Sequence, residues 1–130
     1  MEEPLWMDMA DVVIAHDLEL AVHGGSTGIR DAGLLESALA RAKNIWAYAE
    51  STPSLVRLAA AYAFGISPNH PFVDGNKRTA LLVSFAFLDV NGMEVTASQK
   101  DAYLTILGLA AGEISEDQLA LWFERNTASR

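Results

Sequence analysis

The residues with the greatest capacity for chemistry lie in one run, His70 to Arg78, with the sequence HPFVDGNKR. Two apolar segments, 54–66 and 79–90, flank this run. Burying charged groups without partners is strongly unfavourable, so the run must face solvent at a cleft or hold a charged ligand. We therefore take it as the candidate functional site.

The second half of the run has the composition of an anion site. Gly75 or Asn76 opens a helix, whose free backbone N–H groups and positive dipole end attract an anion. Lys77 and Arg78 in that first turn are unfavourable unless something negative binds there. Arg78 can grip phosphate oxygens through two N–H groups, and Lys77 acts as a compact point charge. A polyphosphate fits this arrangement.

The first half of the run adds a metal ligand and a base. Asp74 offers a carboxylate of the kind that holds Mg²⁺ together with nucleotide phosphates. His70 is the only group in the run whose type suits it to accept a proton near neutral pH. The set predicts transfer from a nucleotide to a hydroxyl. The alternative, a capped helix with a solvated charge cluster, explains each residue singly but not the set.

Other catalytic motifs are absent from the sequence. The residue spacings of an HExxH zinc site, a Walker loop and a Ser-His-Asp hydrolase are not found.

Two central helices are expected to position the run. Prolines on both sides of His70 disfavour helix, so this residue lies on a loop. Before the loop, Thr52 has the type of an N-cap and Pro53 that of a first helical residue, which predicts a helix over 53–63. After it, residues 76–90 predict another buried helix that stops at an Asn-Gly pair.

Four further helices are predicted from capping residues and apolar periodicity. The capping residues are Asp8 for a helix that stops at Gly24-Gly25, Asp31 for 32–46, Ser98 for a helix closed by Gly112, and Ser115 for a last helix. His16, inside the first helix, is interpreted as a packed or capped structural histidine. The chain from Asn126 onward is expected to fray.

Two short segments are less defined. The glycine-rich segment 24–30 has the composition of a plain connection between helices. Ile29 and Arg30 would also suit a strand-like flap over a site, since they place an apolar anchor beside a cation. Residues 93–95 are β-prone and form either one edge strand or nothing regular.

Length and composition point to one all-helical domain over residues 1–130. The net charge of −8 would repel a phosphate backbone, so direct binding of nucleic acid is not expected. The chain has no cysteine, an acidic N-terminus and no apolar run of membrane-spanning length. We therefore expect a cytoplasmic protein without a membrane partner.

The run and its surroundings resemble a known family. HPFVDGNKR resembles the Fic motif, and the Lys of GNKR with the TALL sequence after it resembles the Doc branch, the death-on-curing toxins. Weaker similarity extends through the HD and GG of the first helix, IRDAGLLESAL and AAGEIS. The resemblance implies an all-α Fic/Doc helical fold, with the active-site loop between two central helices and a short flap.

The resemblance also implies roles for the residues of the loop. His70 would be the general base for a target hydroxyl, and Phe72 would anchor the loop in the core. Asp74 would bind Mg²⁺ or help to orient the hydroxyl. Gly75 and Asn76 would form the anion hole.

Further roles follow for the cations and the flap. Arg78 would hold a distal phosphate, and the flap of Gly28, Ile29 and Arg30 would align a target segment by strand addition. Lys77 would set the reaction. Most Fic enzymes have Gly there and transfer AMP from ATP, whereas the Lys of the Doc branch is thought to reverse the nucleotide so that the γ-phosphate faces the hydroxyl.

The implied function is that of a Doc-like toxin kinase that uses ATP and Mg²⁺ to phosphorylate a translation factor, elongation factor Tu. The sequence has no Ser/Thr-x-x-x-Glu-Gly/Asn inhibitory helix, so a separate antitoxin protein would neutralise it. Two alternatives stay open. Pro71 and Gly75 match the AMP-transferring pattern, which would make the protein an AMP transferase. It could instead be a non-catalytic module that binds a nucleotide or a partner.

Overall fold

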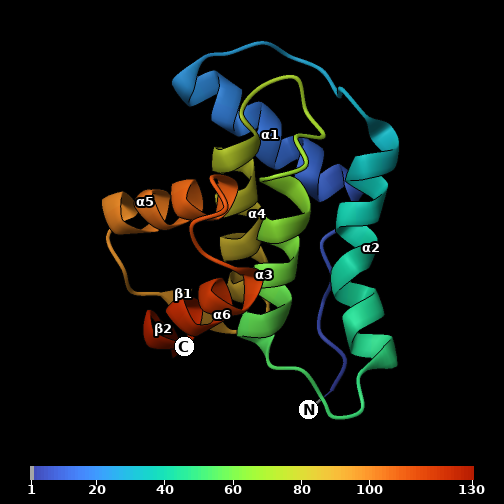
Figure 1. The fold of residues 1–130 in the computed structure, drawn as a ribbon, viewed down its shortest axis with the longest axis vertical. Coiled ribbons are helices and arrows are strands. Elements are labelled where there is room, and N and C mark those ends of the chain that lie inside the picture. Colours follow the sequence, from blue (N-terminus) through green and yellow to red (C-terminus); the bar gives the residue numbers. More distant parts are fainter. Residues whose placement is uncertain (1) are drawn as a thin grey trace.

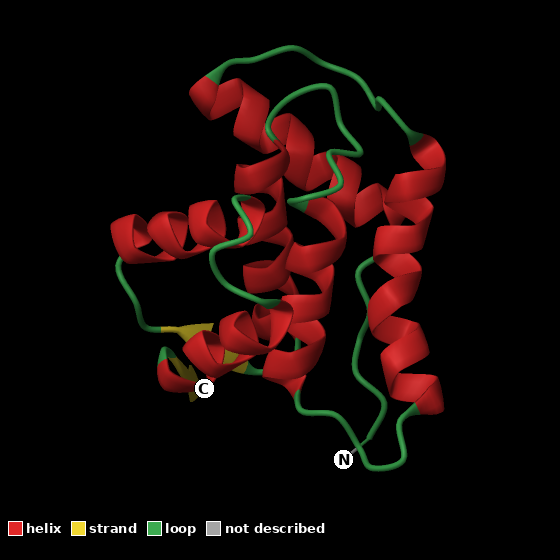
Figure 2. Cartoon of the chain, viewed as in Figure 1, coloured by secondary structure: helices red, strands yellow, loops and turns green. Residues whose placement is uncertain are grey.

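The computed structural model describes residues 2–130, in which helices predominate (Figures 1 and 2). The helices are α1 (Met9–His23), α2 (Ala32–Tyr48), α3 (Leu55–Ile66), α4 (Asn76–Val90), α5 (Gln99–Ala110) and α6 (Glu116–Arg125). The strands are β1 (Met93–Val95) and β2 (Thr127–Ser129). The predicted helical fold is confirmed, with a small antiparallel sheet added to it.

Helices α3 and α4 form the centre, as predicted. Figure 1 shows them side by side, with α1 across one end, α2 on one side, and α5 and α6 on the other. Small residues let the helices approach closely. A Cβ on Gly65 of α3 would lie only 2.8 Å from the Cα of Ala38 in α2. This pair therefore fixes how near α2 can lie to the central helices.

Most predicted helix starts are confirmed, because each depends on one local side chain. Asp8, Asp31, Ser98 and Ser115 all accept a hydrogen bond from a backbone N–H in the first turn of their helix. The start of α3 was predicted wrongly. Ser54, rather than Thr52, is its N-cap, and its Oγ accepts from the N–H of Arg57.

The end of the chain corrects a second prediction. Residues 127–129 do not fray but pair with β1, with Glu94 opposite Ala128. The N–H of Thr96 donates to the carbonyl of Asn126 at 2.7 Å, which extends the pairing. The partner strand is more than thirty residues away in sequence, so local reasoning could not supply it.

None of the helices in residues 2–130 is long and apolar enough to span a membrane.

Candidate active site

The loop between α3 and α4 carries His70, as predicted, and holds it in an unusual conformation. His70 has a φ of +51°, which few residues with a side chain adopt. Its N–H donates to the carbonyl of Ile66 at 3.2 Å, so the loop continues directly from the last turn of α3. A left-handed residue of this kind is maintained only where its surroundings determine it.

Phe72 anchors the loop in the core. Its side chain is only 1% exposed and stacks on the ring of His16, with centroids 3.9 Å apart. The side chain of Asn76 then closes the loop on itself, since Oδ1 accepts from the N–H of Phe72 and Nδ2 donates to its carbonyl. The Asn76 side chain is therefore occupied by the loop, and only its backbone N–H is left to meet an anion. The same Nδ2 lies 3.5 Å from Nδ1 of His70.

His16 is a packed residue, as predicted, but it also supports the site. It is 3% exposed, and its Nε2 lies 2.8 Å from the carbonyl oxygen of Asp74. This contact connects α1 to the loop. The sequence alone indicates that His16 is packed but does not show which segment it touches.

The N-terminus of α4 differs from the other helix starts. Its N-cap is Gly75, in the left-handed region at φ +75°, and no side chain caps it among the described residues. The first-turn N–H groups of α4 therefore have no side-chain acceptor in residues 2–130. They border a cavity of about 360 Å³. The candidate catalytic and anion-binding residues of the run line this cavity: His70, Asp74, Gly75, Asn76, Lys77 and Arg78.

Asp74 is held in place by backbone N–H groups. Its Oδ1 accepts from Gly75 at 2.8 Å and its Oδ2 from Ser26 at 3.2 Å. Gly25 makes room for it, because a Cβ there would lie 2.7 Å from Oδ2. In the described residues no three His, Cys, Asp or Glu side chains gather to hold a metal. Asp74 fits Mg²⁺ only as a single carboxylate whose remaining partners are phosphate and water oxygens.

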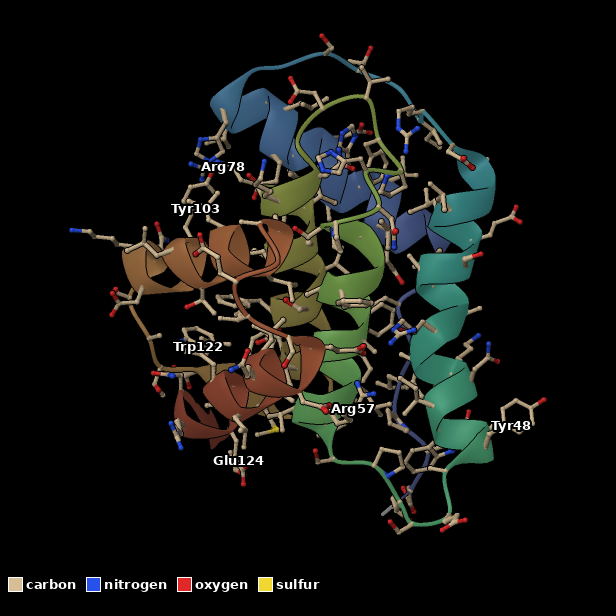
Figure 3. All side chains as sticks on the ribbon, in the orientation of Figure 1. Tyr48, Arg57, Arg78, Tyr103, Trp122 and Glu124 are labelled. Atoms are coloured by element: carbon tan, nitrogen blue, oxygen red, sulfur yellow. The ribbon has the colours of Figure 1, made fainter. Side chains whose placement is uncertain are left out.

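Six residues outside the run also line the cavity, and the three with polar side chains among them are Glu19, His23 and Tyr103. The Cζ of Arg78 lies 4.2 Å from the centre of the Tyr103 ring, and Figure 3 shows these two side chains together. Nη1 of Arg78 is 3.3 Å from Nε2 of His23, which in turn is 3.5 Å from Oε2 of Glu19. Sequence analysis missed all three. The only local signal was His23, four residues after Glu19 and directly before Gly24-Gly25.

The segment of Gly28, Ile29 and Arg30 lies along the loop and pairs with it through one isolated bridge. Ile29 and Phe72 form an isolated antiparallel bridge. The N–H of Arg30 donates to the carbonyl of Pro71 at 2.8 Å, and the N–H of Val73 donates to Gly28 at 3.0 Å. The glycine-rich segment is thus more than a connection between α1 and α2, because its backbone pairs with the loop that carries His70.

Comparison with known proteins shows the family of this chain. The model of the Fic/DOC family matches residues 6–88. The chain is 37% identical over 110 residues to the protein kinase doc of Escherichia phage P1, covering 85% of this chain and 86% of that protein. It is also 37% identical over 92 residues to toxin Doc of Mycolicibacterium smegmatis, covering 71% of this chain and 68% of that one. These matches, which include the loop of His70 to Arg78, show that this chain belongs to the Fic/DOC family.

Proposed function

We propose that this protein is a Doc-type toxin kinase that transfers the γ-phosphate of ATP to a hydroxyl of a protein target. One observation carries the proposal. His70, Asp74, Lys77 and Arg78 line a single cavity at the N-terminus of α4, which no side chain of residues 2–130 caps. The names of the two Doc relatives, one a kinase and one a toxin, support the reaction and its biological role.

In the proposed reaction each of these side chains has a part. The target oxygen forms a bond to the γ-phosphorus, the bond from that phosphorus to the β,γ-bridging oxygen breaks, and ADP leaves. The proton of the target hydroxyl passes to the imidazole of His70. Lys77, Arg78 and the first-turn N–H groups of α4 offset the negative charge of the phosphates.

Asp74 would hold Mg²⁺ through a carboxylate that Ser26 and Gly75 already orient. The metal would neutralise part of the phosphate charge when it binds with the nucleotide. Arg78 lies between the Tyr103 ring and His23, so its planar guanidinium is placed at the cavity wall before a phosphate arrives. Pre-placement of this kind lowers the cost of ordering the site on binding.

We propose elongation factor Tu as the target and a separate antitoxin as the neutralising partner, both in the cytoplasm. The acidic chain, with a net charge of −8, favours a protein substrate over a nucleic acid. The relative named a toxin supports the need for an antitoxin, because a growth-arresting enzyme must be neutralised in the cell that makes it.

AMP transfer is the second candidate function. It is supported by Gly75, which as a glycine places no side chain at the start of α4, and by Pro71 in the loop. Lys77 argues against it, because its side chain lines the cavity where the phosphates of an AMP donor would lie.

Labelled ATP distinguishes these functions. Purified protein is incubated with Mg²⁺ and elongation factor Tu, or with a bacterial lysate, and ATP labelled at the α- or the γ-phosphate. Transfer of the γ-label, absent in His70→Ala, is expected. Transfer of only the α-label would establish AMP transfer instead. If neither label is transferred, and His70→Ala arrests growth as well as the unchanged protein does, the non-catalytic alternative replaces both.

A further inference from the structure

Arg30 binds the backbone of the loop that carries His70. Its Nε donates to the carbonyl of His70 at 2.7 Å, and its Nη2 donates to the carbonyl of Asn69 at 2.9 Å. The backbone N–H groups of Arg30 and Asp31 both donate to the next carbonyl, that of Pro71, at 2.8 and 3.0 Å. Three consecutive carbonyls of the loop thus accept hydrogen bonds from one short segment.

These bonds converge on the residue whose backbone is strained. His70 has a φ of +51°, and a residue with a side chain stays in this region only when its neighbours hold it there. Asn76 fixes the loop on the far side of His70 through Phe72. Arg30 fixes the near side, at the carbonyls of Asn69 and His70 itself.

The chemistry of arginine suits this role. Its planar guanidinium presents several N–H donors in a fixed arrangement, so it can satisfy two adjacent carbonyls at once. A lysine ammonium lacks this fork. Within residues 2–130, no carboxylate forms an ion pair with Arg30. Its hydrogen bonds are therefore made to the loop and not to a counter-ion.

The pairing direction leaves one edge of the segment open. Gly28 and Arg30 use their carbonyl and N–H toward the loop. Successive residues of a strand direct their backbone groups to opposite sides, so the N–H and carbonyl of Ile29 face away from it. Ile29 is also 45% exposed. A target segment added at this edge would hydrogen-bond to Ile29, next to the residue that binds the His70 carbonyl.

We propose that Arg30 is a positioning residue. It holds His70 in its left-handed conformation and couples the edge at Ile29 to the base. The kinetic consequence rests on the proposed phosphate transfer, but the conformational consequence does not. Arg30 touches neither the phosphates nor the target hydroxyl in this assignment, so its loss should act through the orientation of His70.

Kinetics of three variants test the proposal. Arg30→Ala should lower kcat by about 10- to 100-fold, since a base displaced by about 1 Å loses this much, while the KM for ATP stays nearly unchanged. Arg30→Lys should fall between Arg30→Ala and the unchanged protein, and added guanidinium should restore part of the activity of Arg30→Ala. Arg125→Ala, which removes an exposed arginine of α6, is the matched control and should behave as the unchanged protein.

A spectroscopic measurement separates this proposal from the proposed function. The ¹³Cα and ¹³Cβ chemical shifts of His70 report its backbone conformation in the full chain without any substrate. They should move in Arg30→Ala, and less in Arg30→Lys, but not in Arg125→Ala. Unchanged His70 shifts in folded Arg30→Ala would overturn the proposal, as would a raised KM for ATP with unchanged kcat. If no variant transfers phosphate but the shifts move as expected, only the proposed function fails.

Discussion

Two clusters of basic side chains in this protein differ in their partners. Arg41 of α2 and Arg57 of α3 both bind Glu116 at the start of α6, with Nη1 of Arg57 2.7 Å from the carboxylate. Lys77 and Arg78 lie in the first turn of α4, and in residues 2–130 neither forms an ion pair with a carboxylate. One cluster contains its counter-ion, and the other borders a cavity.

The difference indicates which basic side chains stabilise the fold and which are available to bind a substrate. Glu116 connects three helices, and its side chain is only 11% exposed, so its partners are satisfied within the fold. Lys77 and Arg78 add positive charge to the positive end of a helix, which destabilises the folded chain. Binding of a polyphosphate would remove that repulsion, so the counter-ion of this cluster is expected to be the substrate.

Arg78→Ala should have the largest effect, on phosphate transfer and on ATP binding. Loss of a charged donor to a transition-state phosphate is expected to lower transfer by about 100- to 1,000-fold. ATP should also no longer raise the melting temperature, because the protein gains stability only from a ligand that it binds. Transfer assays and thermal melts with and without ATP check both points. An ATP-dependent melting temperature as high as that of the unchanged protein would remove Arg78 from the phosphate site.

Glu116→Gln should have the next largest effect, and on stability alone. Removing the carboxylate leaves Arg41 and Arg57 without their partner and is expected to cost about 1–3 kcal/mol in free energy of unfolding. Asp117→Asn is the matched control, because Asp117 is 86% exposed and lies 3.9 Å from Arg57. It should cost almost nothing. Urea denaturation measures both, and a change of kcat in Glu116→Gln would contradict a purely structural role.

Tyr62 provides a neutral buried group for comparison with the two charged clusters. Its hydroxyl accepts from the N–H of Met7 at 3.0 Å, and burial raises the pKa of Tyr62 to about 12. The folded pKa lies above the ordinary value of 10.0, so the neutral hydroxyl of Tyr62 stabilises the folded state. This contribution to the free energy of unfolding is complete below pH 10 and is lost as the pH rises toward 12. Tyr62→Phe should cost about 1 kcal/mol at neutral pH. Between pH 10 and pH 12 the free energy of unfolding of Tyr62→Phe should then fall less than that of the unchanged protein, as measured by urea denaturation at each pH.

Lys77→Gln should have the smallest effect on stability and the opposite sign. Removing a cation from the first turn of α4 is expected to raise the free energy of unfolding by about 0.3–1 kcal/mol without ATP. The gain should vanish in saturating ATP, where the lysine has an anionic partner. Denaturation of the unchanged protein and Lys77→Gln, each with and without ATP, makes this comparison. A loss of stability in both conditions would show that Lys77 already has a partner in the fold.

The parts of the fold that sequence predicted well are those that depend on neighbours in the chain. Asp8, Ser98 and Ser115 cap their helices through the next few backbone N–H groups, which the sequence shows directly. The loop of His70 likewise lies between two apolar helices because its prolines and glycine interrupt them. Thr52 and Ser54 are both good capping residues, so the sequence does not distinguish them, and Ser54 is the one that caps α3.

The parts that sequence missed depend on contacts between distant segments. β2 needs β1 as its partner, and Tyr103 reaches Arg78 only because α5 packs on α4. His23 enters the cavity because α1 crosses the end of the central helices (Figure 1). The residues of the run could be named from type and spacing, whereas the residues that hold them could not.

Gly25 has a consequence for genetics. It lies far outside the run in sequence, yet a side chain there would meet the Asp74 carboxylate at 2.7 Å, and its φ of +123° favours glycine. Where expression of this chain arrests growth, clones that escape the arrest should carry replacements of Gly25 as well as of His70. Such alleles should still yield folded, abundant protein. Survival would then reflect an inactive site and not degradation of the chain.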